Sequence, residues 1–417
     1  MADDSKDMVH VNKDHWSPSF VEELLPAAQK TALLYQLSYL CLANFPTLER
    51  IIRARAVETQ LLFGSSDATM LKCILTSENL VQSLFPMLGK AVEKNKPILA
   101  VKYLAKAREW IKDIIHDVDK IVEKYDLHNK DVATSTSDVI KEKIDTEKKM
   151  SEKDQELKQT EVALNQLKAE LQKASKELAE VEQKINAKSH ELQDFARSVT
   201  QTSKGLGIFA ALVPFAGLVV KSIYDAVKDP ENAAKMKGLE AELNNLISDK
   251  TALKHKEWEL QLQIIDWQMK VSRASFERSS IPDPIHLSEV QSSLSKIQAI
   301  LIQLKNFWES VAQMLDYLEQ KTFVGEDLID DLSELKDEFL DSIKAAKGAW
   351  CSFGEGCKKA SVIFKLNTRD AYKFLEVSPS SLSKEEWDKE YNSVKKQLED
   401  LSPPKPVKSC ETPAINN

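Results

Sequence analysis

The residues that could carry out acid–base or metal chemistry are few and dispersed along the chain. Seven histidines occur, and none has a ligand-type spacing to a cluster of Cys, Asp or Glu. His116 lies near the carboxylates of Asp113, Asp117 and Asp119. This spacing is more typical of a solvated acidic helix face than of a metal site. We therefore predict no catalytic residue, no metal ligand and no cofactor.

Motifs for nucleotides and nucleic acids are missing as well. Gly205-x-Gly207 precedes no βα turn, so it is not a dinucleotide fingerprint, and no nucleophile-elbow motif occurs. A net charge of −8 and a pI near 5.6, without a basic block, argue against a nucleic-acid partner. The five cysteines are odd in number and scattered. Cys351 and Cys357 could bridge a small loop, but free thiols are favoured. These features exclude most enzyme classes.

One uncharged and strongly apolar stretch stands out at residues 205–220, between Lys204 and Lys221. As a continuous helix it would reach about 24 Å, short of the ~30 Å hydrocarbon core of a bilayer. Its three glycines and one proline also disfavour a straight helix. The residues that could enter a membrane are Leu206, Ile208, Phe209, Leu212, Val213, Pro214, Phe215, Leu218, Val219 and Val220.

A hairpin is one shape that fits this stretch. With its apex between Leu212 and Val213, both flanking lysines would lie at the same level, at a membrane interface. Lysines at such a boundary can lay their stems along apolar matter and keep the ammonium group in water. The alternative is a buried core helix or a packed turn.

Two long segments with a seven-residue apolar repeat flank the stretch and would position it. The first seam consists of Leu157, Leu164, Leu171, Leu178, Ile185, Leu192 and Val199, and the second of Leu239, Leu246, Leu253, Leu260, Trp267 and Ala274. Such repeats are coiled-coil seams. Two seams separated by an apolar turn predict an antiparallel helical hairpin with the apolar stretch at its distal end.

The whole chain is predicted to be helical, since only ten of its 417 residues are glycine and no strand pattern occurs. We predict an all-α fold, an elongated bundle of long antiparallel helices whose coiled-coil hairpin has an apolar tongue at its tip. Helix breaks are expected at 63–67, 126–137 and Gly348–Gly356, and a kink near Pro86. The predicted parts are a loose N-terminus (1–18), N-terminal bundle helices (19–137), the first arm (138–203), the tongue (204–227), the second arm (228–280), C-terminal bundle helices (281–401) and a disordered tail (402–417).

This arrangement resembles the α-helical pore-forming toxins, the family of cytolysin A, haemolysin BL, the non-haemolytic enterotoxin and related two-component insecticidal toxins. The resemblance covers roughly residues 20–350 and rests on the Gly- and Pro-containing tongue between two seams. It implies binding of a lipid membrane through the tongue, homo-oligomerisation and permeabilisation. In cytolysin A relatives an N-terminal amphipathic helix swings out to line the pore, and Glu22–Leu48 is the matching segment. Extra C-terminal helices beyond about Gly348 leave open whether a second toxin component is needed.

The tongue must be covered in water, because so many exposed apolar side chains would cause aggregation. Two other functions stay open, an intracellular coiled-coil scaffold or tether with a packed apolar elbow, and a protein permanently anchored by the hairpin. The polar start Met1–Lys6 has no signal-peptide pattern. We expect a soluble protein, cytoplasmic when made, with release by a non-classical route as an option and the target cell membrane as its site of action.

Overall fold

The computed structural model describes residues 19–149, 155–200, 230–278, 285–319, 336–369 and 371–403. Within these ranges the chain forms helices and no strand, so the predicted all-α class is confirmed. The α-helices are α1 (Ser19–Cys41), α2 (Pro46–Asn79), α3 (Phe85–Glu93), α4 (Pro97–Lys149), α5 (Gln155–Thr200), α8 (Pro230–Arg278), α9 (Ile285–Leu318), α11 (Lys336–Arg369) and α12 (Lys384–Asp400). A π-helical turn, η1 (Leu80–Leu84), and two 3₁₀ turns, η3 (Lys373–Glu376) and η4 (Pro379–Ser381), complete the list.

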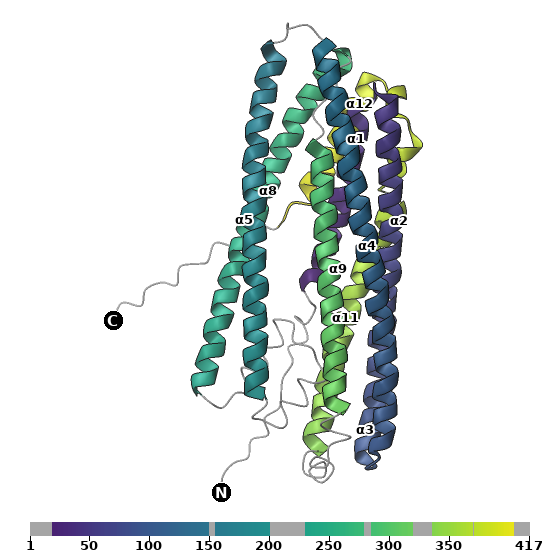
Figure 1. The fold of residues 1–417 in the computed structure, drawn as a ribbon, viewed down its shortest axis with the longest axis vertical. Coiled ribbons are helices and arrows are strands. Elements are labelled where there is room, and N and C mark those ends of the chain that lie inside the picture. The colour runs from purple at the N-terminus through teal and green to yellow at the C-terminus, as the bar shows by residue number, and fades with distance from the viewer. Residues whose placement is uncertain are drawn as a thin grey trace, which may run out of the picture.

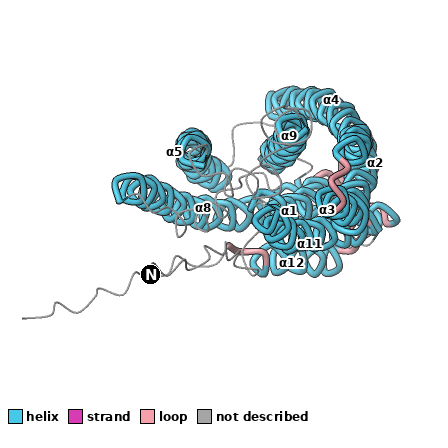
Figure 2. The backbone as a smooth tube through the Cα atoms, turned by 90° about the horizontal axis from the view of Figure 1, so that it is seen from below, coloured by secondary structure: helices cyan, strands magenta, loops and turns pink. Residues whose placement is uncertain are grey.

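The long helices run along the long axis of an elongated molecule (Figure 1). Helices α5 and α8 form a pair on one side, and the other long helices gather into a bundle on the opposite side (Figure 2). Helix α1 lies within this bundle and packs against α9, α11, α12 and α2. The elongated bundle with an antiparallel helical pair is the architecture that the sequence predicts.

The bundle is held together by close packing of large aromatic side chains. Phe307 and Trp308 on α9 meet Trp350 and Phe353 on α11, with ring centroids between 4.8 and 5.9 Å apart. Their stacked, tilted and edge-on geometries are those that aromatic quadrupoles favour. This cluster packs α9 against α11 within the bundle core.

The helix break predicted at 126–137 is wrong, because α4 is continuous from Pro97 to Lys149. The segment contains a run of hydroxyl residues that usually favours turns. Here the hydroxyls of residues 134–137 each donate a hydrogen bond to the carbonyl four residues earlier, within the helix. Val132 and Val139 are fully buried in the bundle. Tertiary packing therefore outweighs the local turn preference, and the first arm of the hairpin is α5, a separate helix that begins at Gln155.

Two further predicted breaks are also wrong. Helix α2 passes through 63–67 without interruption, and the predicted loop Gly348–Gly356 is part of α11. That helical turn buries Cys357 and exposes Cys351, and both thiols are free, as the sequence favoured. The kink expected near Pro86 coincides with η1, which ends two residues before that proline. A π-helical turn is a recognised cause of a local bend.

Candidate functional site

The predicted membrane-entering residues lie outside the described part of the chain. This applies to Lys204, Lys221 and every residue between them, including Phe209, Leu212 and Val213. The structure does describe the two helices that hold this segment, α5 before it and α8 after it.

Helices α5 and α8 are antiparallel and packed in a fixed register. Three contacts show this in order along α5: Ser175 Oγ donates to Glu257 Oε1 over 2.7 Å, Lys188 Nζ pairs with Glu242 Oε2 at 2.8 Å, and Lys235 Nζ lies 4.4 Å from the ring centroid of Phe195. As the residue number rises along α5, that of its partner falls along α8 by a similar amount. The antiparallel contact predicted for residues 140–200 with 232–278 is therefore confirmed for α5 and α8, whereas residues 140–149 belong to α4, which packs against α9 and α2 instead.

The apolar seam of the pair is formed by the predicted heptad positions. Leu164, Leu171 and Ala174 on α5 pack against Leu260 and Ile264 on α8 as a cluster separate from the bundle core. Trp267 packs on the edge of this cluster, so packing accounts for that residue. Other buried seam residues are Leu178, Leu192, Leu239, Leu243 and Val271. Apolar side chains of both helices thus form one shared buried seam, as heptad repeats favour.

The hairpin register brings the ends of α5 and α8 to the same level. Helix α5 ends at Thr200 and α8 begins at Pro230, and these two ends lie side by side at the lower end of the hairpin, short of the lower ends of α3 and α11 (Figure 1). Residues 201–229 therefore connect two neighbouring helix ends. A hairpin-shaped tongue requires its two supporting helices to end next to each other, and the ends of α5 and α8 meet this requirement.

The N-terminal part of α1 is tied to α8 by a cluster of charges. Glu23 on α1 pairs with Lys250 at 2.7 Å and Lys254 at 3.1 Å, and Lys250 also pairs with Glu182 of α5 at 3.3 Å. Burial would raise the pKa of the Glu23 carboxyl, but Lys254 and Lys250 outweigh it and lower that pKa. For Lys254, burial and the other lysines lower the pKa despite Glu23. The cluster joins α1 to both arms of the hairpin.

A second charged residue of α1 reaches two other helices. Lys30 pairs with Glu289 on α9 at 3.3 Å, and its Nζ lies 5.4 Å from the ring centroid of Trp258 on α8. Such a cation–π contact is favourable, more so where water is partly excluded. The segment Glu22–Leu48, which the resemblance singled out, therefore includes most of α1, a helix that contacts both the hairpin and the bundle.

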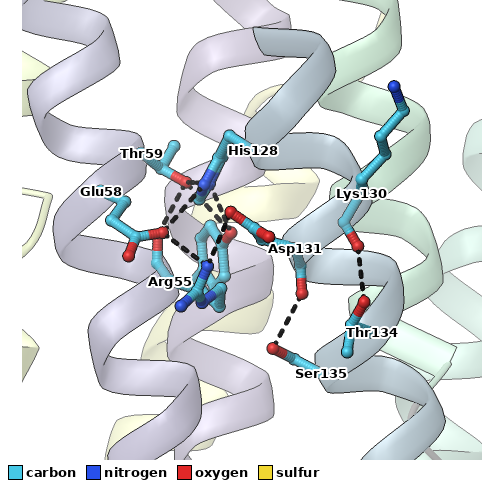
Figure 3. A network of polar contacts seen from close by, with 9 residues as sticks. Arg55, Glu58, Thr59, His128, Lys130, Asp131, Thr134 and Ser135 are labelled. Atoms are coloured by element: carbon cyan, nitrogen blue, oxygen red, sulfur yellow. Dashed lines mark hydrogen bonds and ion pairs between the residues drawn. The ribbon is translucent and has the colours of Figure 1, made fainter. Parts of the chain in front are cut away.

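A buried polar network links α1, α2 and α4 around His128 (Figure 3). Nε2 of His128 lies 2.6 Å from the Thr59 hydroxyl and 3.4 Å from that of Tyr35, and Nδ1 lies 3.2 Å from Glu58 Oε2. Arg55 in turn pairs with Glu58 at 2.8 Å and with Asp131 at 3.2 Å. The network satisfies polar groups that would be costly to bury alone.

The protonation of His128 follows from its partners. Because an ionised carboxylate only accepts, the Nδ1 that faces Glu58 carries the hydrogen, and Nε2 accepts from a hydroxyl. Burial, reinforced by the charge of Arg55, lowers the pKa of His128 to about 4. The imidazole is therefore neutral at neutral pH. We assign it a structural role, since it lies inside the bundle with every ring nitrogen engaged.

Two other kinds of site, a membrane-spanning helix and a metal centre, are absent from the described residues. No described helix combines the length and the apolar character needed to cross a bilayer. In the same part of the chain, no group of three or more His, Cys, Asp or Glu residues could hold a metal ion.

Several solved structures match this chain, and components of toxins are among them. The HblL1 toxin component of Bacillus cereus is 12% identical, with 83% of this chain and 97% of that chain covered and a TM-score of 0.39. The SmhB pore of the tripartite α-pore-forming toxin Smh from Serratia marcescens is 13% identical, with coverages of 80% and 97% and a TM-score of 0.32. PaxB from Photorhabdus luminescens is 14% identical, with coverages of 77% and 94% and a TM-score of 0.23. No family model matches the chain, and no curated protein matches its sequence.

Proposed function

We propose that this chain is a pore-forming, cytolysin-like protein. Its water-soluble form inserts the apolar residues 206–220 of the tongue into a lipid bilayer, assembles with further copies and permeabilises the membrane. The observation that supports this most is the position of the apolar run in the segment that connects two neighbouring helix ends at the lower end of the hairpin (Figure 1). A long rigid hairpin presents such a run to a surface.

The composition of the tongue supports insertion in preference to exposure. Each large apolar residue in it gains about 1.5–3 kcal/mol on leaving water. The same residues must be covered by protein, or by another copy, before lipid replaces that cover. Exchange of one apolar environment for another changes the free energy little, so modest differential binding to lipid can shift the equilibrium. The partners of the proposal are the bilayer, further copies of the chain and, as an option, a second toxin component.

The register of the arms bears on where the tongue turns. Thr200 and Pro230 are level, and the residue midway between them in sequence is Phe215. The midpoint of the lysine pair lies between Leu212 and Val213. In both cases Leu212, Val213 and Phe215 lie among the deepest residues of an inserted hairpin. We propose that Lys204 and Lys221 stay at the headgroups on either side.

Helix α1 would be the second moving part. The resemblance implies that the segment Glu22–Leu48 leaves the bundle to line the pore. The charges that hold α1 to α8 and α9 would then be separated, a change that favourable contacts in the assembled pore must offset. We infer that α1 is released after the tongue has bound lipid.

Release of a trapped dye from liposomes tests the proposed function. We expect the full chain to release the dye and to form ring-shaped particles visible by electron microscopy of the treated liposomes. Neither a coiled-coil scaffold nor a permanent anchor releases the dye, so intact liposomes would refute the proposal. A fluorophore at Val213 adds a local readout, because lipid-embedded quenchers should reach it only after binding. Lasting protection at saturating lipid would favour a packed elbow instead.

A further inference from the structure

A stripe of exposed apolar and small residues runs along the outer face of α2. We define the α2 stripe as the seven exposed residues Ala54, Val57, Leu61, Gly64, Ala68, Leu71 and Leu75. Leu61 and Leu75 expose 68% and 58% of their surface, and Val57 and Leu71 expose 40% and 39%. Helix α2 lies on the side of the bundle away from α5 and α8, so the hairpin does not cover the stripe (Figures 1 and 2).

The spacing within the stripe alternates between three and four residues, which is the spacing of a coiled-coil seam. Helix α2 already uses its opposite face in the bundle, where Ala56, Phe63, Met70 and Cys73 are buried. A helix that is apolar on two faces is typical of one packed between partners on both sides. In the described part of the chain, the second face of α2 has solvent in place of a partner.

We propose that the α2 stripe pairs with the same stripe of a second copy of this chain, in an antiparallel two-fold contact. In an antiparallel coiled coil, one register brings Leu61 of one copy against Gly64 of the other. The same register places Val57 against Ala68 and Ala54 against Leu71. Each of these three layers combines a larger with a smaller residue, which is how facing positions interdigitate without voids, and Leu75 lies against the stem of Arg50. A two-fold axis makes each of these contacts twice.

Charges at the two ends of the stripe favour the same orientation. Arg50 and Arg53 lie just before the stripe, and Glu78 lies just after it. Antiparallel pairing places Arg50 of each copy within one helical turn of Glu78 of the other, and Lys72, which is level with Arg53 in this register, already pairs with Asp117. In-register parallel pairing would instead bring arginines together and set Gly64 against Gly64, which leaves a gap at the centre. The contact would extend along about 33 Å of helix on each copy.

The substitution Gly64→Leu distinguishes this specific contact from non-specific hydrophobic association. A Cβ at Gly64 meets nothing within 4 Å, and leucine is a better helix former than glycine, so the single chain tolerates the change. In the proposed dimer the new side chain would collide with Leu61 of the second copy. Leu61→Glu is a second variant that removes the central large residue. Val162→Glu is the matched control, because Val162 is 58% exposed on α5, far from the stripe.

Sedimentation velocity of the full chain over a wide concentration series is the measurement. We expect the wild type to shift from 47.1 kDa towards twice that mass as concentration rises. The Val162→Glu variant should behave in the same way, whereas Gly64→Leu and Leu61→Glu stay monomeric with helical circular dichroism unchanged. A wild type that is monomeric throughout would overturn the proposal. Equal or stronger self-association of the Gly64→Leu variant would also overturn it, because that result is expected from non-specific hydrophobic association. The outcome does not depend on membrane activity.

Discussion

The hydroxyl of Ser175 on α5 donates a hydrogen bond over 2.7 Å to the carboxylate of Glu257 on α8. Lys296 of α9 lies 3.9 Å from the same carboxylate, so one glutamate joins both arms of the hairpin to the bundle. Burial would raise the pKa of Glu257, but Lys296 and Lys30 outweigh it and lower that pKa. The hairpin is therefore anchored along its length, far from the end that holds the tongue.

The seam of the hairpin can be tested with Leu164→Asp. Leu164 is fully buried between α5 and α8, so a carboxylate there loses apolar packing and is costly to bury. We expect a loss of about 3 kcal/mol or more in the local stability of the pair, measured as faster amide hydrogen exchange in α5 and α8. Val162→Asp, two residues earlier and exposed, is the control. Equal exchange in both variants and the wild type would show that position 164 is not in the seam.

The charge cluster at the start of α1 can be tested with Glu23→Gln. Removal of this carboxylate leaves Lys250 and Lys254 close together, and we expect unfolding at pH 7 to be easier by about 1–3 kcal/mol. Because the folded pKa of Glu23 lies below its ordinary value of 4.5, its contribution is complete above that pH and is lost as pH falls through the folded pKa. Denaturant titrations of both proteins should therefore converge at low pH. A constant gap would contradict this assignment, and exposed Glu93→Gln is the control.

The buried histidine predicts a loss of stability in mild acid. The unfolded chain binds a proton at His128 near pH 6.5, whereas the folded chain does so only near pH 4. Between these values the unfolded state is favoured as pH falls, by about 3 kcal/mol in total, with no further loss from this group below pH 4. A His128→Gln variant removes this component but keeps the titration of every carboxylate. Parallel stability–pH curves for the two proteins would show that the imidazole is not held neutral.

The hairpin could be predicted from the sequence because its seams are leucine-rich and strictly periodic. The buried network could not be recognised in the same way. Its helix α4 continues the same three-and-four spacing through Val118, Ile121, Tyr125, His128, Val132, Ser135 and Val139, all of them buried. The polar members of this series suggested a turn. Their spacing was the signal that could have shown a buried face.

Other features depend on contacts between distant parts of the chain. The pairing of Glu23 with Lys250 and Lys254 joins residues far apart in sequence, and no local pattern indicates it. The helical turn at Gly348 shows a related effect, because a glycine costs a helix only about 1 kcal/mol. Burial of Trp350 and Phe353 beside it outweighs that cost. The sequence thus showed which segments are apolar, but not which distant segments they meet.

Release of α1 can be tested by a disulfide that ties it to α8. Cys41 Sγ, at the end of α1, lies 3.1 Å from Ser272 Oγ on α8, so Ser272→Cys places two thiols within bonding reach. If α1 must leave α8, the variant oxidised with diamide should release little dye from liposomes, and reduction should restore release. Wild type treated in the same way controls for the native cysteines. Full release by the oxidised variant would show that the end of α1 stays on α8 during permeabilisation.

The central claim is that residues 206–220 enter the bilayer, and Leu212→Asp tests it most directly. A charge near mid-depth costs about 2.5–3.5 kcal/mol on insertion scales and much less near the interface. The account predicts that Leu212→Asp abolishes lipid binding and dye release while the helical circular dichroism of the water-soluble form is unchanged. Lys204→Arg, which keeps the interfacial charge, should release dye as the wild type does. Equal dye release from wild type and Leu212→Asp would contradict a membrane role for this segment.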